Sequence, residues 1–132
     1  MSIKNHLIFT IIISIIIAPI VRFNALYFII GSVLIDVDHY LYYIMRYRKF
    51  NLGKIYTYWA KHPNKFAKES ICVFHTLEFI SVVIVLSFFS FKAFILASGI
   101  LFHLVLDFYN EFVIMKLTKH YSLFGYLLKR IS

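Results

Sequence analysis

Three clusters of acidic residues and histidines lie inside apolar segments of this sequence. They are Asp36, Asp38 and His39 in GSVLIDVDHY, His75 in VFHTLEF, and His103 with Asp107 in GILFHLVLD. A carboxylate inside a membrane-spanning segment is costly unless a partner compensates its charge. Carboxylates and imidazoles that gather in one place are the usual ligands of a divalent metal ion. The residue types therefore predict a metal site inside an apolar protein.

The spacing within each cluster is helical. Asp36 and His39 are three residues apart, His75 and Glu78 are three apart, and His103 and Asp107 are four apart. Residues three or four apart share one face of a helix, so each pair can present a carboxylate and an imidazole in the same direction. Three such helices would resemble the carboxylate-rich metal sites of soluble helical bundles.

Three of the candidate residues keep more than one role on sequence grounds. Asp38 points away from Asp36 on a straight helix, so it is a ligand of a second ion, a partner of a ligating histidine, or a helix-end residue facing water. If it is not a ligand, Asp38 or Glu78 is the candidate to orient or deprotonate a water molecule. His6 is expected at a shallower depth than the other candidates, which leaves it between a ligand and a structural residue.

The composition describes a membrane protein. Of 132 residues, 61% are hydrophobic and 15% are charged, and the mean hydropathy is +0.80, which indicates a single integral membrane domain over residues 1–132. The net charge of +8 comes from basic residues that flank the apolar runs. This placement favours anionic lipid headgroups over nucleic acid as partners. The single cysteine, Cys72, excludes an intramolecular disulfide and a CxxC metal motif.

Four apolar stretches approach the roughly 20 residues that a membrane-spanning helix needs. They cover residues 6–21, 25–45, 71–90 and 92–115, so we expect an all-α membrane protein built as a four-transmembrane-helix bundle. Lys4 before an isoleucine-rich stretch is also typical of a signal peptide, but no small-x-small cleavage site follows, and the first stretch is expected to be retained. Gly31 and Gly99 are expected to let helices approach closely.

The distribution of lysine and arginine predicts the orientation in the membrane. Twelve of the fourteen basic residues belong to the N-terminus, the segment 46–70 and the C-terminal segment, whereas Arg22 and Lys92 fall in the two short turns. Loops rich in lysine and arginine stay in the cytoplasm. We therefore expect a multi-pass membrane protein with both termini cytoplasmic, a basic interfacial segment between helices 2 and 3, and an amphipathic C-terminal segment. All three clusters and His6 then reach the same leaflet.

These motifs resemble a known family. GSVLIDVDH, a following FHT segment and GILFHLVLD are similar to the YdjM-like family of inner-membrane metal-dependent hydrolases, whose pattern is an N-terminal histidine, G-x-x-x-P-D-x-D-H, a T-H-S segment and G-x-x-x-H-x-x-x-D. The resemblance extends from His6 to Asp107, with Ile35 in place of the proline and Phe74-His75-Thr76 in place of Thr-His-Ser. It implies metal ligation by His6, Asp36, Asp38, His39, His75, His103 and Asp107.

The same family is distantly similar to the zinc-dependent phospholipase C and nuclease fold, which holds zinc ions with HxxxD and HxxxE pairs on helices. The resemblance thus implies phosphoester cleavage with a divalent metal, zinc above all, on a phosphorylated lipid or lipid-linked substrate at the cytoplasmic leaflet. The basic segment would hold anionic headgroups near the site. The sequence lacks HExxH, HxxHH, GxSxG and a glycine-rich phosphate loop, which disfavours other enzyme classes.

Two functions of other classes use the same residues. The acids and histidines could form a path for protons or divalent cations, although a path should continue into the outer half, where the sequence places no acid or histidine. Alternatively, the metal could hold short helices together in a noncatalytic membrane subunit.

Overall fold

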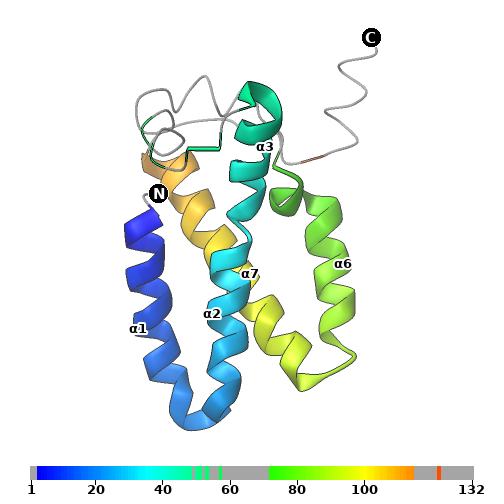
Figure 1. Ribbon diagram of the computed structural model, residues 1–132. Helices are drawn as coiled ribbons and strands as arrows, with labels where there is room; N and C mark the ends of the chain where they lie inside the picture. Colours follow the sequence, from blue (N-terminus) through cyan, green and yellow to red (C-terminus); the bar gives the residue numbers. More distant parts are fainter. Residues whose placement is uncertain are drawn as a thin grey trace.

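The described part of the chain is helical. The computed structural model describes residues 3–48, 50, 51, 53, 57, 72–114 and 122, and these contain no β-strand, which confirms the predicted all-α class. Helix α1 (Ile3–Val21) is followed by a 3₁₀ turn, η1 (Arg22–Asn24), that reverses the chain. Helix α2 (Ala25–Leu34) returns beside α1, and α3 (Val37–Tyr47) continues in the direction of α2 (Figure 1).

The second half of the described chain repeats this hairpin. A 3₁₀ turn, η2 (Val73–His75), leads into α6 (Leu77–Ser87), and α7 (Phe91–Phe108) runs back across the molecule and ends in a π-helical turn, η3 (Tyr109–Ile114). The N-terminus, η2 and the end of α7 therefore lie at one end of the helices, and the two tight turns lie at the other (Figure 1). We call these the site end and the turn end.

Two glycines allow α2 and α7 to cross in direct backbone contact. A Cβ atom added to Gly31 would overlap the carbonyl group of Leu96, and one added to Gly99 would overlap the carbonyl group of Phe28. The contact is reciprocal, because each helix supplies one glycine and one carbonyl. The close approach predicted for Gly31 and Gly99 is therefore confirmed, and it fixes α2, which ends two residues before Asp36, against α7, which carries the third cluster.

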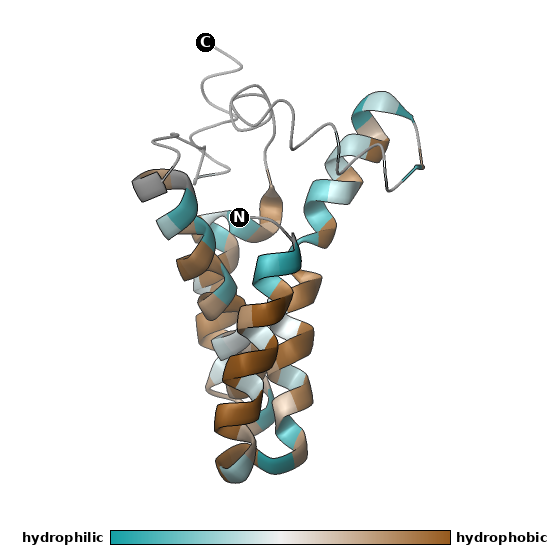
Figure 2. Cartoon of the chain, turned by 90° about the vertical axis from the view of Figure 1, so that its left-hand side faces the viewer, coloured by the Kyte–Doolittle hydropathy of each residue, from teal (hydrophilic) through white to brown (hydrophobic). Residues whose placement is uncertain are grey.

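The side-chain distribution on α1 is the reverse of that on a helix of a water-soluble protein. His6, Thr10 and Ser14 are buried on one face, whereas Ile15 and Ile16 are 67% and 62% exposed on another. Figure 2 shows a hydrophobic band along α1 between hydrophilic residues at its two ends. Two helical stretches, Lys4–Tyr47 with its reversal at η1 and Phe91–Phe108, are long and apolar enough to cross a membrane.

The predicted third span does not form one continuous helix. Of residues 71–90, the structure describes 72–90, and α6 within them has 11 residues, a length of about 16 Å against the roughly 30 Å of a bilayer core. The side chain of Thr76 accepts a hydrogen bond from the Phe79 amide and caps the N-terminus of α6. Helix α6 therefore begins after Thr76, inside the apolar run. The basic interfacial segment, apart from isolated positions, and the amphipathic C-terminal segment lie outside the described residues.

Candidate metal centre

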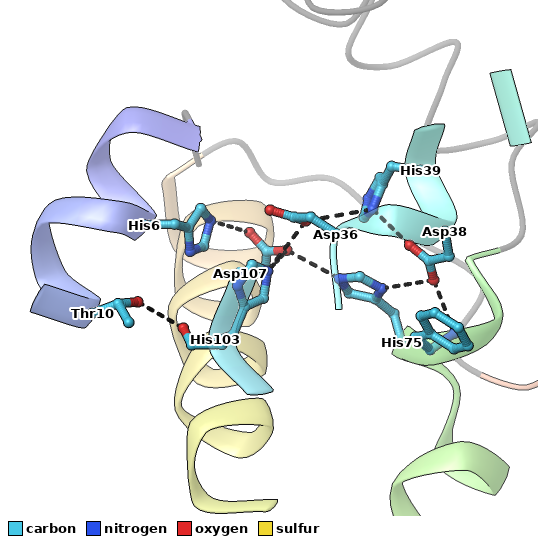
Figure 3. Close-up of polar contacts among 10 residues, drawn as sticks. His6, Thr10, Asp36, Asp38, His39, His75, His103 and Asp107 are labelled. Atoms are coloured by element: carbon cyan, nitrogen blue, oxygen red, sulfur yellow. Dashed lines mark hydrogen bonds and ion pairs between the residues drawn. The ribbon is translucent and has the colours of Figure 1, made fainter. Parts of the chain in front are cut away.

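The predicted site residues converge near the site end from four separate parts of the chain. His6 lies three residues into α1, about 5 Å along its axis, while His103 and Asp107 lie about 18 and 24 Å along α7. Asp36 precedes α3, and His75 ends η2. Figure 3 shows their side chains pointing toward one another, with His75 between Asp107 and Asp38.

Four of these side chains form a group that could hold one metal ion. Asp36, His75, His103 and Asp107 each offer one ligand atom, and these atoms lie within 4.8 Å of one another. The Nε2 atom of His103 is 3.3 Å from Asp36 Oδ1 and 3.3 Å from Asp107 Oδ2. The Nε2 atom of His75 is 3.4 Å from the same oxygen of Asp107. We call these four residues the first group.

The distances in the first group fit ligands of a common ion better than hydrogen bonds. Nitrogen and oxygen ligands at 2.0–2.1 Å from a tetrahedral zinc ion are separated by about 3.3 to 3.4 Å, whereas charged N–H···O hydrogen bonds measure about 2.7 to 2.9 Å. Nε2 of His103 is buried and makes no hydrogen bond with the described residues. A buried polar atom left in this state is costly. The donor set and its spacing therefore fit a divalent metal.

His6 supports the first group from outside. Its Nε2 atom is 2.8 Å from Asp107 Oδ1, a hydrogen-bond distance, while the other oxygen of Asp107 faces His75 and His103. The ring of His6 also stacks on that of His103, with 4.2 Å between centroids. A partner that holds a ligating carboxylate in this way orients it. The sequence placed His6 too shallow because the helix begins by Ile3 and not at residue 6.

Asp38 and His39 lie on the other side of His75. Asp38 Oδ2 is 3.2 Å from Nδ1 of His75 and accepts a hydrogen bond from the amide of Phe74, 2.9 Å away. Asp38 Oδ1 is 2.9 Å from Nδ1 of His39, and the same nitrogen is 3.5 Å from Asp36 Oδ1. His75 therefore faces Asp107 with one ring nitrogen and Asp38 with the other, which places Asp38 where it can fix the orientation of the ring.

An interruption between α2 and α3 explains how Asp36 and Asp38 serve the same site. Helix α2 ends at Leu34, the residues Ile35 and Asp36 form a turn, and α3 begins at Val37. On a straight helix Asp36 and Asp38 would point in nearly opposite directions. The turn changes this relation, so Asp36 contacts His103 while Asp38 contacts His75.

One predicted residue lies outside the cluster and one cluster member was missed. Glu78 is exposed on α6, where Ser122 donates a 2.8 Å hydrogen bond to it, and neither candidate group within the described residues includes it. Cys72 is 1% exposed and belongs to a second group with Asp38, His39 and His75. Its position three residues before His75 is the signal that the sequence offered, because one short turn brings both side chains to the same place.

Access to the first group is uneven. The side chain of His103 is fully buried, those of His75 and Asp107 are 5% and 10% exposed, and that of Asp36 is 15% exposed. Asp36 therefore lies at the side of the group nearest to the surface.

Comparisons with known proteins do not assign this chain to a family. No protein family, curated protein or solved structure matches it. The case for a metal centre therefore stands on the residues, their distances and their burial. The similarity to the YdjM-like family stays a hypothesis based on short motifs.

Proposed function

We propose that this chain is a membrane-embedded metal-dependent hydrolase whose ion is held by the first group: Asp36, His75, His103 and Asp107. The observation that carries the proposal is the set of 3.3 to 3.4 Å separations among nitrogens and oxygens of four side chains from three segments. Two imidazoles and two carboxylates suit zinc, which takes four such ligands. With four protein ligands, a catalytic water would need a fifth coordination position, which zinc can adopt during catalysis.

The chemistry proposed is cleavage of a phosphoester. A divalent ion held by the first group would supply Lewis-acid polarisation of a phosphoryl group and a source of hydroxide near neutral pH. His6 holds Asp107, and Asp38 holds His75, so both ligands are kept in one orientation. Of the two acids predicted to accept a proton from water, Asp38 lies in the cluster, and Glu78 lies on the exposed surface of α6.

The substrate class follows from the surroundings of the site. The exposed face of α1 is apolar, which suits contact with lipid tails, and the cluster lies near one end of the helices, as a site for a lipid headgroup would. Basic residues flank the apolar runs in the sequence and would attract anionic headgroups. We propose a phosphorylated lipid or lipid-linked substrate in the cytoplasmic leaflet of the inner membrane, in agreement with the YdjM-like resemblance.

The membrane arrangement is part of the proposal. Helices α1, α2 with α3, and α7 would cross the bilayer, and residues 72–90 would form a fourth, shorter segment entering from the site end. Arg22 in η1 and Lys92 in the first turn of α7 lie at the turn end. With the site end cytoplasmic, these two are the basic residues of the outer side.

The decisive experiment measures metal content and turnover on the same samples. The full chain is purified in detergent, its zinc is quantified, and phosphate release is followed from short-chain phosphatidic acid in mixed micelles. Asp36→Ala and His103→Ala should lose the ion of the first group and the activity. Glu78→Gln is the matched change to an exposed carboxylate and should keep both.

The outcomes separate the competing functions. Unchanged zinc content in both Asp36→Ala and His103→Ala would eliminate the first group as the metal site. Zinc retained without turnover on phosphatidic acid or on a phosphodiester lipid, together with loss of helical structure on chelation, would indicate a structural metal site. Metal-dependent ion flux into proteoliposomes would indicate a conduction pathway.

A further inference from the structure

A second group of potential ligands lies beside the first and contains the one cysteine of the chain. Asp38, His39, Cys72 and His75 are all buried, and their ligand atoms lie within 4.8 Å of one another. Cys72 is held in place by the η2 turn, in which the amide of His75 donates a 3.0 Å hydrogen bond to the carbonyl of Cys72. The proposed hydrolase function assigns no role to the thiol of this cysteine.

The environment of Asp38 indicates a bound ion in this second group, independently of the cysteine. Its Oδ1 atom is buried and makes no hydrogen bond with the residues the structure describes, and the whole residue is 6% exposed. The nearest partner is Nδ1 of His39, 2.9 Å away. This distance is shorter than the separations in the first group, but the two atoms do not meet in hydrogen-bond geometry, so the buried Oδ1 atom lacks a compensation that a bound cation would supply.

We propose that Asp38, His39, Cys72 and His75 form a second metal position, in which Cys72 contributes a thiolate. This inference rests on the first group as the first metal position and deepens the proposed function by making the centre dinuclear. A thiolate combined with imidazole and carboxylate suits zinc among the common divalent ions. Asp38 then serves as a ligand, and not as the acceptor of a proton from water.

The position of His75 defines the proton balance. It faces Asp38 with Nδ1, 3.2 Å away, and Asp107 with Nε2, 3.4 Å away. With both positions loaded, His75 bridges them as an imidazolate. The Cys72 thiol then releases one proton because it binds as a thiolate, and the His75 ring releases its N–H proton because both ring nitrogens serve as ligands; both protons pass to solvent. With the first position alone loaded, the Nδ1 proton stays and is donated to Asp38.

The test uses cobalt as a spectroscopic substitute for zinc. The full chain in detergent is stripped with a chelator and titrated with Co²⁺, while absorbance and metal content are recorded. Because the chain has a single cysteine, a sulfur-to-cobalt charge-transfer band can arise only at Cys72. The wild type should show this band and bind about two ions, whereas Cys72→Ser and Cys72→Ala should lose the band and bind about one.

Two further variants keep the test independent of folding and of the first position. Ile95→Val, a change of similar size in a buried residue of α7, should keep the band and both ions. His103→Ala should lose one ion and keep the band. Helical content by circular dichroism identifies any variant that fails to fold.

The results can overturn the inference without touching the proposed function. The second position would be refuted if the cobalt-loaded wild type lacked the sulfur band. It would also be refuted if the wild type bound a single ion whose binding required His103 and not Cys72. Both results would leave the first position intact. A sulfur band that persists without any phosphate release would leave the second position intact and refute the hydrolase. Release of the two extra protons on loading the second position, measured in weak buffer, supports the bridge; fewer protons would refute it.

Discussion

The two ends of the helices are built on different physical principles. Toward the turn end, Val21, Phe28 and Ile95 form an apolar core, and Lys92 lies over the ring of Tyr27 at 5.9 Å from its centre. Toward the site end, the buried side chains include six ionisable ones: His6, Asp38, His39, His75, His103 and Asp107. The apolar core at the turn end is stabilised by packing alone, whereas the buried charges at the site end must be compensated by a partner. The comparison teaches that packing positions the helices and that a ligand completes the site.

The largest effect is expected from a substitution at the site end. His103→Ala removes a fully buried imidazole that faces two carboxylates. We expect metal affinity and activity to fall by more than about 100-fold, since loss of an outer partner alone costs about 10- to 100-fold. Chelation of the wild type should lower its stability by about 2.7 kcal/mol relative to protein with metal at 100 times its Kd. Detergent unfolding with and without chelator measures this, and equal midpoints would contradict it.

A substitution in the contact between α2 and α7 should lower stability through packing and not through charge. Gly99→Val places a side chain where the carbonyl of Phe28 lies, so α2 and α7 must separate. We expect a loss of about 3 kcal/mol in the free energy of unfolding, at the upper end for overpacking. Ser98→Val, at the neighbouring position, which is partly buried, is the control and should cost less than about 1 kcal/mol. Equal losses for both variants would remove the reciprocal glycine contact as an explanation.

The support given by His6 provides a smaller effect. His6→Ala removes the hydrogen bond to Asp107 and the stacking on His103 but leaves the first group intact. Metal affinity should fall by about 10- to 100-fold, with no change in the number of ions bound at saturation. Competition with a chelating dye measures the affinity. Leu7→Ala, on the exposed side of α1, is the matched control, and an affinity loss as large as that of His6→Ala would show a general effect of α1.

The smallest expected effect lies between the two ends. Thr10 and Ser32 share a buried 2.7 Å hydrogen bond that joins α1 to α2. A double-mutant cycle with Thr10→Val and Ser32→Ala should give a coupling free energy of about 0.6 to 1.7 kcal/mol, as for hydrogen bonds between membrane helices. Metal content should not change. Fully additive losses would mean that the bond contributes nothing to the contact between α1 and α2.

The sequence was informative where the residue type alone indicates its surroundings in the fold. A carboxylate or a histidine in an apolar run demands compensation wherever the helix goes, so the three clusters could be located before any fold was known. The helical spacing of His103 and Asp107 placed both on one face of α7, as observed. Gly31 and Gly99 were identified because small residues are typical of close helix contacts.

The sequence was less informative where local backbone geometry decides. Hydropathy over a window cannot detect the cap at Thr76 or the turn at Ile35 and Asp36, since both lie inside apolar runs. For that reason residues 71–90 were expected to be one span, and the direction of Asp38 stayed open. Cys72 was missed because a lone cysteine three residues before a histidine becomes informative only when a turn places the two side chains together.

The contact between His6 and Asp107 joins positions 101 residues apart, and this has a consequence for biosynthesis. The ribosome produces His6 and Asp36 long before α7, the helix that carries their partners Asp107 and His103. Until α7 is made and packed, the acids of the nascent chain must be tolerated by water, headgroups or the insertion machinery. A chain truncated before α7 would lack both His103 and Asp107, so the synthesis of α7 decides when the first group can assemble.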